Sequence, residues 1–250
     1  MSTKENLAQA EIKAKGKPLQ KMFNQVPNNY DFLNRLLTFR LDEYWRKMAV
    51  KAILKEEPEE VMDLGTGTGD LAIRVAKKLK NSGITGYDFS PAMLIHAKEK
   101  ANKYDLGNVR FIEGDAAQMP FEDNKFDVTG ISFAFRNITF KNPNTDLYLK
   151  EIYRTLKPGG KLIIVESSQP KSRVVRFLFH SYLHYIVSGV GGFISPARGA
   201  YHYLAYSAKK FYTRPELTQL IEKQGFKDTR HKPMLLGAAA ITISTKPGEY

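Results

Sequence analysis

The fold of this chain is decided by one stretch, Val61-Met62-Asp63-Leu64-Gly65-Thr66-Gly67-Thr68-Gly69-Asp70. Its mostly apolar beginning predicts a short strand, and apolar residues recur at helical spacing after its end, at Ala72, Val75, Ala76 and Leu79. Glycines between a strand and a helix let the backbone approach a ligand that side chains would exclude. The stretch therefore predicts a strand, a ligand-binding turn and a helix.

Outward from this unit, predicted strands and helices alternate along the chain. We expect further strands at 84–88, 109–112, 126–132, 162–165, 228–231 and 238–244. Alternation predicts a parallel sheet with helices on both faces, whereas the last two strands, adjacent in sequence, predict an antiparallel hairpin at the sheet edge. The predicted fold class is α/β, a doubly wound, mostly parallel, seven-stranded sheet of the Rossmann-like type.

The rest of the chain is arranged around this sheet. Residues 1–21 are basic and nearly free of apolar side chains, and we expect a mobile arm there, followed by a single domain over 22–250. Within the domain we expect a helical preface at 22–57, a cofactor-binding half at 58–166, a helical lid insertion at 167–212, and a closing helix with edge strands at 213–250. The insertion is inferred because the strand pattern stops after Glu166.

Composition narrows the class of protein. The 250 residues are 42% hydrophobic and 26% charged, which is ordinary for a globular chain. The absence of cysteine excludes a disulfide scaffold, a thiolate zinc site and a cysteine nucleophile, and the five histidines have no metal-ligand spacing, so we expect no metal. No apolar run reaches bilayer length and no signal peptide is evident, so we expect a soluble, cytoplasmic protein.

The net charge of +12 predicts an anionic partner. A nucleic acid, an acidic lipid surface and a phosphorylated ligand would each satisfy it, and charge alone does not choose among them.

The glycine turn favours one cofactor over another. The dinucleotide pattern G-x-G-x-x-G, started at Gly65, needs a glycine where this chain has Asp70, which makes NAD the weaker interpretation. Asp63 and Asp70 flank the turn and suit a ligand with a cationic end. S-adenosylmethionine has such an end in its ammonium and sulfonium groups.

Polar residues at three further strand ends complete this predicted site. Asp88 closes the second strand 19 residues after Gly69 and can accept hydrogen bonds from ribose hydroxyls, while Asp115 can receive an adenine amino group. The constellation resembles that of class I methyltransferases. The predicted cofactor-binding residues are Asp63, Gly65, Gly67, Thr68, Gly69, Asp88, Asp115, Ala116 and Ser132.

Four more segments, spread from Met22 to the end of the chain, resemble one family, the ubiquinone/menaquinone biosynthesis C-methyltransferases. They are Tyr30-Asp31-Phe32-Leu33-Asn34 with Thr38 and Trp45, Phe133-Ala134-Phe135-Arg136-Asn137, Arg154 to Gly160 with Glu166 and Ser168, and Tyr201-His202-Tyr203-Leu204. The chain departs from the family pattern at Arg35, Asp42, Thr155 and His202, where the family usually has an acidic residue, a histidine, a valine and an arginine.

The resemblance implies methyl transfer from S-adenosylmethionine to a ring carbon of demethylmenaquinol, or of a prenylated benzoquinol on the ubiquinone route. Such transfer needs alignment of the reactants rather than a covalent nucleophile. The resemblance implies Arg136 and Asn137 as catalytic residues. Arg136 would stabilise the quinolate charge or orient a water that takes the proton, and Asn137 would hold a ring oxygen. It also implies that Tyr30, Asp31, Tyr201 and Tyr203 line the acceptor pocket.

Three alternatives stay open at this point. Ribose methylation of a nucleic acid would explain the charge, although we expect no nucleic-acid partner. The acceptor would otherwise be another lipid-like small molecule, or the chain would be a catalytically idle, cofactor-binding subunit, which turnover by the pure protein would exclude.

The predicted insertion links the charge to the substrate. From Lys171 to Arg214 there are seven basic residues and no acidic one, interleaved with aromatic side chains. We expect residues 171–212 to form a mobile lid, hinged at Gly189, Gly191, Gly192 and Gly199, that docks on an anionic membrane surface. The expected location is therefore cytoplasmic and peripheral at the inner face of the membrane, with a homodimer as the candidate assembly.

Overall fold

The computed structural model describes residues 27–190 and 198–248. The predicted basic arm, 1–21, lies outside the described residues, as do 191–197 within the predicted insertion. The side chains at 27–30, 33, 190 and 198–201 are outside it too.

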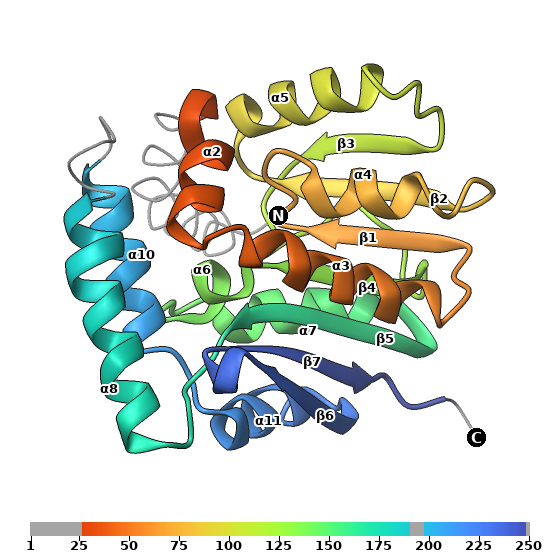
Figure 1. The fold of residues 1–250 in the computed structure, drawn as a ribbon. Helices are drawn as coiled ribbons and strands as arrows, with labels where there is room; N and C mark the ends of the chain where they lie inside the picture. The colour runs from red at the N-terminus through yellow and green to blue at the C-terminus, as the bar shows by residue number, and fades with distance from the viewer. Residues whose placement is uncertain (1–26, 191–197, 249–250) are drawn as a thin grey trace, which may run out of the picture.

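A seven-stranded sheet forms the centre of the molecule, in the order β3-β2-β1-β4-β5-β7-β6 (Figure 1). The strands are β1 (Glu60–Leu64), β2 (Gly83–Asp88), β3 (Val109–Glu113), β4 (Phe126–Ser132), β5 (Leu156–Ser167), β6 (Lys227–Met234) and β7 (Ala239–Thr245). The first five strands are parallel, and β7 lies antiparallel between β5 and β6. The predicted fold class and the antiparallel pairing of the last two strands are confirmed.

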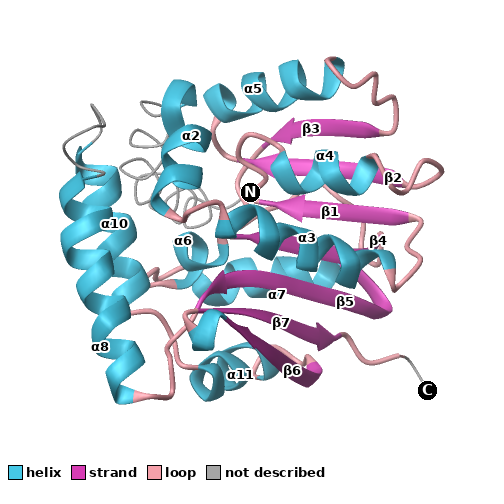
Figure 2. Cartoon of the chain, viewed as in Figure 1, coloured by secondary structure: helices cyan, strands magenta, loops and turns pink. Residues whose placement is uncertain are grey.

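Helices cover both faces of the sheet, because alternate strand residues are apolar toward each side (Figure 2). One face packs against α3 (Leu41–Leu54), α4 (Asp70–Ala76) and α5 (Pro91–Asn102). The other packs against α6 (Phe135–Thr139), α7 (Thr145–Thr155) and α11 (Arg214–Glu222). These two apolar layers hold the carboxyl ends of the parallel strands in a common edge.

Four further helical segments surround that edge. The predicted preface contains α2 (Pro27–Leu37) before α3, and positive φ angles at Phe39 and Arg40 turn the chain between them. The predicted insertion contains α8 (Arg173–Tyr182), the π-helical segment η1 (Leu183–Val190) and α10 (Arg198–Lys209). η1 continues from α8 and packs against α10, and Figure 1 shows these helices beyond the ends of the parallel strands.

The predicted start of one strand was wrong. β5 starts at Leu156, directly after α7, rather than at Leu162. The glycines of Lys157-Pro158-Gly159-Gly160 predict a turn, but Leu156 already pairs with Phe126, and Gly159 donates to the carbonyl of Lys246. Pairing with a neighbouring segment therefore overrides the local turn signal.

Candidate active site

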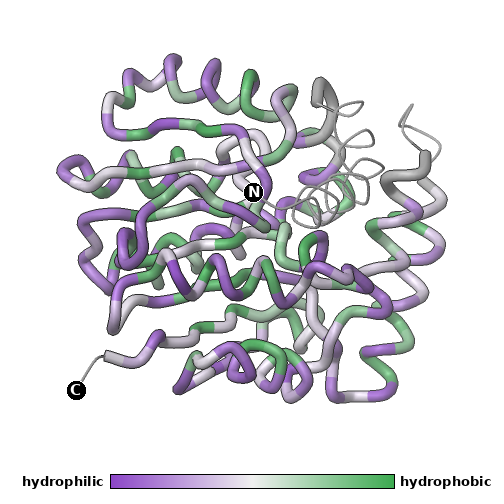
Figure 3. Tube along the Cα trace, turned by 180° about the vertical axis from the view of Figure 1, so that it is seen from behind, coloured by the Kyte–Doolittle hydropathy of each residue, from purple (hydrophilic) through white to green (hydrophobic). Residues whose placement is uncertain are grey.

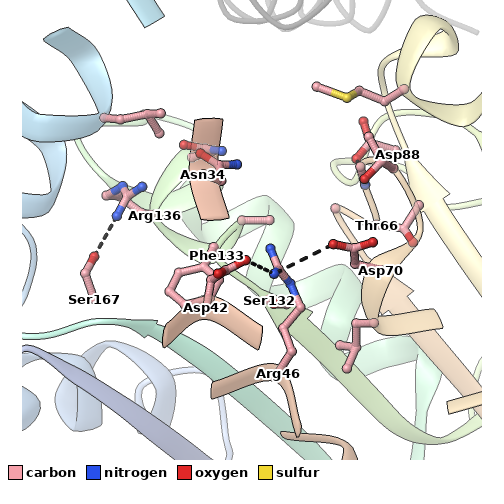
Figure 4. Close-up of a pocket in the computed structure, with 18 of the residues that line it drawn as sticks. Asn34, Asp42, Arg46, Thr66, Asp70, Asp88, Ser132, Phe133, Arg136 and Ser167 are labelled. Carbon is pink, nitrogen blue, oxygen red and sulfur yellow. Dashed lines mark hydrogen bonds and ion pairs between the residues drawn. The ribbon is translucent and has the colours of Figure 1, made fainter. Parts of the chain in front are cut away.

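A pocket of about 1610 Å³, including its open mouth, lies at the carboxyl edge of β1, β2 and β4. Its walls come from α2 and α3, the glycine turn, the segment after β4, and the α8–η1–α10 helices (Figure 4). The cavity therefore joins the predicted cofactor turn to side chains of the predicted insertion.

The glycine turn lines one side of this pocket. Gly65, Gly67 and Gly69 have φ angles of +68°, +54° and +81°, in the left-handed region that favours glycine. A Cβ on Gly65 would lie 2.4 Å from the Cβ of Ala134, whereas a Cβ on Gly67 would meet nothing within 4 Å. The turn thus combines a close approach to the segment after β4 with a backbone that is open toward the cavity.

Asp63 lies beneath the turn and is nearly inaccessible to solvent. Its Oδ2 accepts hydrogen bonds from Thr66 Oγ1 at 2.7 Å and from the Ala72 amide at 3.0 Å, while its buried Oδ1 has no partner. Burial raises the pKa of this carboxyl to about 6. A cationic ligand group would satisfy Oδ1 and favour the charged carboxylate.

Asp88 organises the same turn from the end of β2. Its Oδ2 accepts from the Gly67 amide at 2.8 Å, its Oδ1 accepts from the Ser90 amide at 2.9 Å, and burial raises its pKa. The Phe89 amide also hydrogen-bonds this carboxylate, which can accept about four hydrogen bonds and so keeps capacity for a ligand hydroxyl. Ser90, not Asp88, caps α5 by accepting a hydrogen bond from the Met93 amide.

Of the other predicted cofactor residues, two line the pocket and Asp115 does not. Ala116 lines the pocket, and so does Ser132, whose buried Oγ has no hydrogen-bond partner. Asp115 is exposed, lies outside the pocket lining, and accepts a hydrogen bond from the Ala117 amide. The structure does not bring Asp115 into the site, and its contact with adenine stays a prediction.

A charged cluster that the sequence did not predict joins α2, the turn and α5. Lys100 Nζ donates to Asp31, to Thr68 Oγ1 at 2.9 Å and to Asp70 Oδ1 at 2.9 Å, and Thr68 donates to Asp31 Oδ1 at 2.8 Å. Asp31, which was predicted to line the acceptor pocket, thus accepts a hydrogen bond from Thr68 of the glycine turn. Burial alone would raise the pKa of Asp70, but Arg46 and Lys100 hold it below its usual value. Asp70 is already paired with cations of the chain, so Asp63 is the better partner for a cationic ligand.

Arg136 and Asn137 lie on the opposite side of the pocket, after a turn with positive φ at Phe133. Arg136 Nη1 donates to Glu166 Oε1 at 2.9 Å and to Ser167 Oγ at 2.6 Å, and Figure 4 shows the latter contact. Arg136 and Glu166 are both almost completely buried. The guanidinium is therefore held by a fixed carboxylate while its edge lines the cavity.

Among the predicted acceptor-site tyrosines, Tyr203 is the one whose side chain the structure describes. Tyr203 is half-buried outside the pocket lining, where burial raises its pKa, and the side chains of Tyr30 and Tyr201 lie outside the described residues. Five side chains of α8, η1 and α10 form an apolar wall that the sequence reasoning missed, although their spacing of four residues was visible: Phe179, Leu183, Val187, Leu204 and Ala208.

Unpartnered buried polar atoms gather in this pocket. They are Asp63 Oδ1, Ser132 Oγ, Arg136 Nε and Asn137 Oδ1. Such atoms cost free energy unless a ligand or water pairs with them, so their clustering indicates a binding site. The residues of the pocket fit S-adenosylmethionine. Asp63 suits its cationic end, the backbone of the glycine turn allows a close approach, and Asp88 suits its hydroxyls.

Within 27–190 and 198–248 no group of acidic or histidine side chains is arranged to hold a metal.

Sheet order, glycine turn and pocket together define a class I S-adenosylmethionine-dependent methyltransferase. The fold is similar to that of a SAM-dependent methyltransferase from Aquifex aeolicus, with a TM-score of 0.55 and 20% identity over 78% of this chain and 88% of that one. Residues 11–246 match the ubiE/COQ5 methyltransferase family, and the chain belongs to that family.

Two relatives are similar over most of their length. A demethylmenaquinone methyltransferase of Thermus thermophilus is 37% identical over 90% of this chain and all of its own. A ubiquinone/menaquinone biosynthesis C-methyltransferase UbiE of Geotalea daltonii is 36% identical over 93% of this chain and 97% of its own.

Proposed function

We propose that this enzyme uses S-adenosylmethionine to methylate a ring carbon of demethylmenaquinol, giving menaquinol. The observation that carries the proposal is a pocket with two unlike halves. The half at Gly67 and Asp88 is polar, whereas the half at Leu183 and Leu204 is apolar, and both open into one cavity. A prenylated quinol has a polar ring and an apolar tail, and the tail matches the apolar half of the pocket. A prenylated benzoquinol is the alternative acceptor.

The chain's own residues would perform three tasks. When bound, the cofactor supplies an electrophilic methyl group. Asp63 and Asp88 hold and orient it, because one offers a buried acceptor for a cation and the other offers acceptors for hydroxyls. Arg136 stabilises negative charge that develops on the ring oxygen, and Glu166 fixes the position of that guanidinium. The apolar wall excludes water from the reacting atoms.

Turnover by the purified protein tests the proposal. With labelled S-adenosylmethionine, we expect faster labelling of a short-tail demethylmenaquinol than of a benzoquinol analogue, and none of bulk RNA. Preference for the benzoquinol would favour the ubiquinone route. No labelling of either quinol would contradict the proposal, and it would favour an idle subunit or another acceptor.

The proposal includes docking of α8 and η1 on an anionic membrane. Phe179, Leu183 and Val187 line the pocket, yet the same segment has a second apolar side, where Phe177 is 71% and Tyr185 is 70% exposed. Figure 3 shows hydrophobic and hydrophilic residues alternating along these helices. Exposed apolar patches of this kind mark interaction surfaces, and the acceptor's prenyl tail resides in lipid.

Exposed basic residues at the start of α8 supply the charge for this docking. Lys171 and Arg173 are exposed, whereas Arg176 donates through Nε to the carbonyl of Pro170 at 2.9 Å and has a structural role. Each lysine or arginine near an anionic surface contributes about 1 kcal/mol. In residues 27–190 and 198–248, no helix is long and apolar enough to span a membrane.

Vesicle sedimentation tests the docking. Binding should require anionic lipid, weaken as salt rises, and fall in Lys171→Glu/Arg173→Glu. The matched control Lys78→Glu/Lys80→Glu has the same charge change on exposed residues after α4, at the other end of the sheet, and should bind like the wild type. Equal pelleting with neutral vesicles, or equal losses in both variants, would overturn the docking. The homodimer stays a prediction, which light scattering tests.

A further inference from the structure

The turn between α2 and α3 brings a hydroxyl and a carboxylate to the pocket wall. Thr38 follows α2, Asp42 lies in the first turn of α3, and both line the cavity. In the view of Figure 4, Asp42 lies between the Arg136 side of the pocket and the Asp88 side. This is the region where the acceptor ring would meet the cofactor. The inference that follows rests on the proposed function.

The hydroxyl of Thr38 has two acceptors but only one proton. Its Oγ1 lies 2.7 Å from the carbonyl oxygen of Asn34 and 2.7 Å from Asp42 Oδ1. Thr38 can donate fully to only one of them at a time. The second contact becomes a hydrogen bond when Asp42 carries a proton and donates to Thr38. The pair therefore has a ready position for one additional proton.

The surroundings of Asp42 also accommodate that proton. Asp42 is 3% exposed, so its partners are groups of the protein rather than bulk water. Arg46 Nη1 lies 2.5 Å from Asp42 Oδ2 and 3.7 Å from Asp70 Oδ2. Figure 4 shows Arg46 between the two carboxylates. If Asp42 becomes neutral, Arg46 still faces Asp70, and no buried cation is left without an anion.

A proton acceptor is needed because Arg136 cannot serve as one. A guanidinium is not deprotonated in proteins, and Arg136 is also paired with Glu166. The quinol carbon becomes nucleophilic when the neighbouring hydroxyl loses its proton. Stabilising the oxygen's charge and removing its proton are therefore tasks for different side chains.

We propose that Thr38 and Asp42 form a relay that removes the hydroxyl proton of the acceptor. The acceptor's O–H bond breaks, its proton moves to Thr38 Oγ, and the proton of Thr38 moves to Asp42 Oδ1. The electron pair of that bond flows into the ring, where the adjacent carbon forms its bond to the methyl group while the methyl–sulfur bond of the donor breaks and its electron pair stays on the sulfur. When the methylated carbon later loses its hydrogen to solvent as a proton, the relay returns a proton to the ring oxygen. One proton is released in each turnover, so the relay is unchanged.

Three variants and two acceptors test the relay. Thr38→Val keeps the shape and removes the hydroxyl, Thr38→Ser keeps the hydroxyl, and Asp42→Asn removes the proton acceptor. General-base catalysis contributes about 10²- to 10⁴-fold, so we expect Thr38→Val and Asp42→Asn to lower kcat about 100-fold or more. Thr38→Ser should recover at least about tenfold over Thr38→Val. Calorimetry with S-adenosylmethionine should give the wild-type Kd in all three, which also shows that the variants fold.

The second acceptor is a chlorinated quinol whose hydroxyl is more acidic than that of the parent. A missing base matters less for such a hydroxyl, so the loss in Thr38→Val should shrink about tenfold. Wild-type turnover with an equal loss on both quinols, or with no loss, would overturn the relay while the proposed function stands. Absence of wild-type turnover on either quinol would overturn the proposed function and the relay together.

Discussion

Replacing Arg136 by Met should destabilise the protein by about 3 kcal/mol. The substitution leaves the Glu166 carboxylate buried without its cation, and breaking a buried pair costs about 3–5 kcal/mol. The lower end applies because Glu166 retains hydrogen bonds from the Arg136 amide at 3.1 Å, the Ser167 amide at 2.8 Å and Ser167 Oγ at 2.9 Å. Met also fills most of the arginine's apolar volume, which limits the cavity term.

Urea unfolding measures this loss, and a double-mutant cycle isolates its cause. In Arg136→Met, the Glu166 carboxylate is left buried without a cation, and Arg136→Met/Glu166→Gln removes that charge. The double variant should therefore be more stable than Arg136→Met by about 1–2 kcal/mol. Turnover should be low in both, because neither has a cation on the pocket wall. The buried pair would be refuted as the reason if Arg136→Met were within about 0.5 kcal/mol of wild type. It would also be refuted if the double variant's loss of stability equalled the sum of the losses in Arg136→Met and Glu166→Gln.

Three further predictions follow from the cofactor side. Asp88→Ala should weaken S-adenosylmethionine binding by about 1.5–3 kcal/mol, the range for a hydrogen bond to a charged group, and unchanged affinity in calorimetry would rule out this role. Gly65→Ala should lose more stability in urea than Gly67→Ala, because both have positive φ but only the first forces a Cβ to 2.4 Å from Ala134; equal losses would contradict the close approach. Since burial raises the pKa of Asp63 from 3.8 to about 6, the folded state binds this proton more tightly than the unfolded state, and the unfolding free energy should fall as pH rises from about 4 to about 6. Asp63→Asn should flatten that dependence and weaken cofactor binding, and an unaltered pH profile would show that the carboxyl does not titrate there.

The parts of the site that the sequence predicted best depend on local chemistry. The turn at Gly65 and Gly67 was predictable because only glycine adopts positive φ without strain beside a ligand. Ser132 followed from its place at a strand end, since parallel strands share one carboxyl edge. The same rule predicts Asp115 at this edge, yet Asp115 is not among the lining residues, because a strand end fixes the edge but not which of the next few side chains turns toward the cavity.

Long-range pairs were beyond the sequence because they depend on which elements become neighbours. The ion pair of Arg136 and Glu166 joins residues 30 positions apart and requires β4 to lie beside β5. Lys100 meets Asp31 only because α2 and α5 pack together over the turn. The π-helical geometry of η1 also has no periodic signal distinct from that of an α-helix.

In the proposed reaction, one cavity aligns a cofactor methyl group with a carbon of a quinol ring. The most direct measurement is the position of the label after the pure enzyme has acted on short-tail demethylmenaquinol with ¹³C-methyl S-adenosylmethionine, read by NMR and mass spectrometry. We expect one labelled methyl group on the ring carbon beside the hydroxyl, in a product identical to menaquinol. Label on a ring oxygen, or an unlabelled quinol in the presence of a competent cofactor, would contradict methyl transfer to the ring carbon.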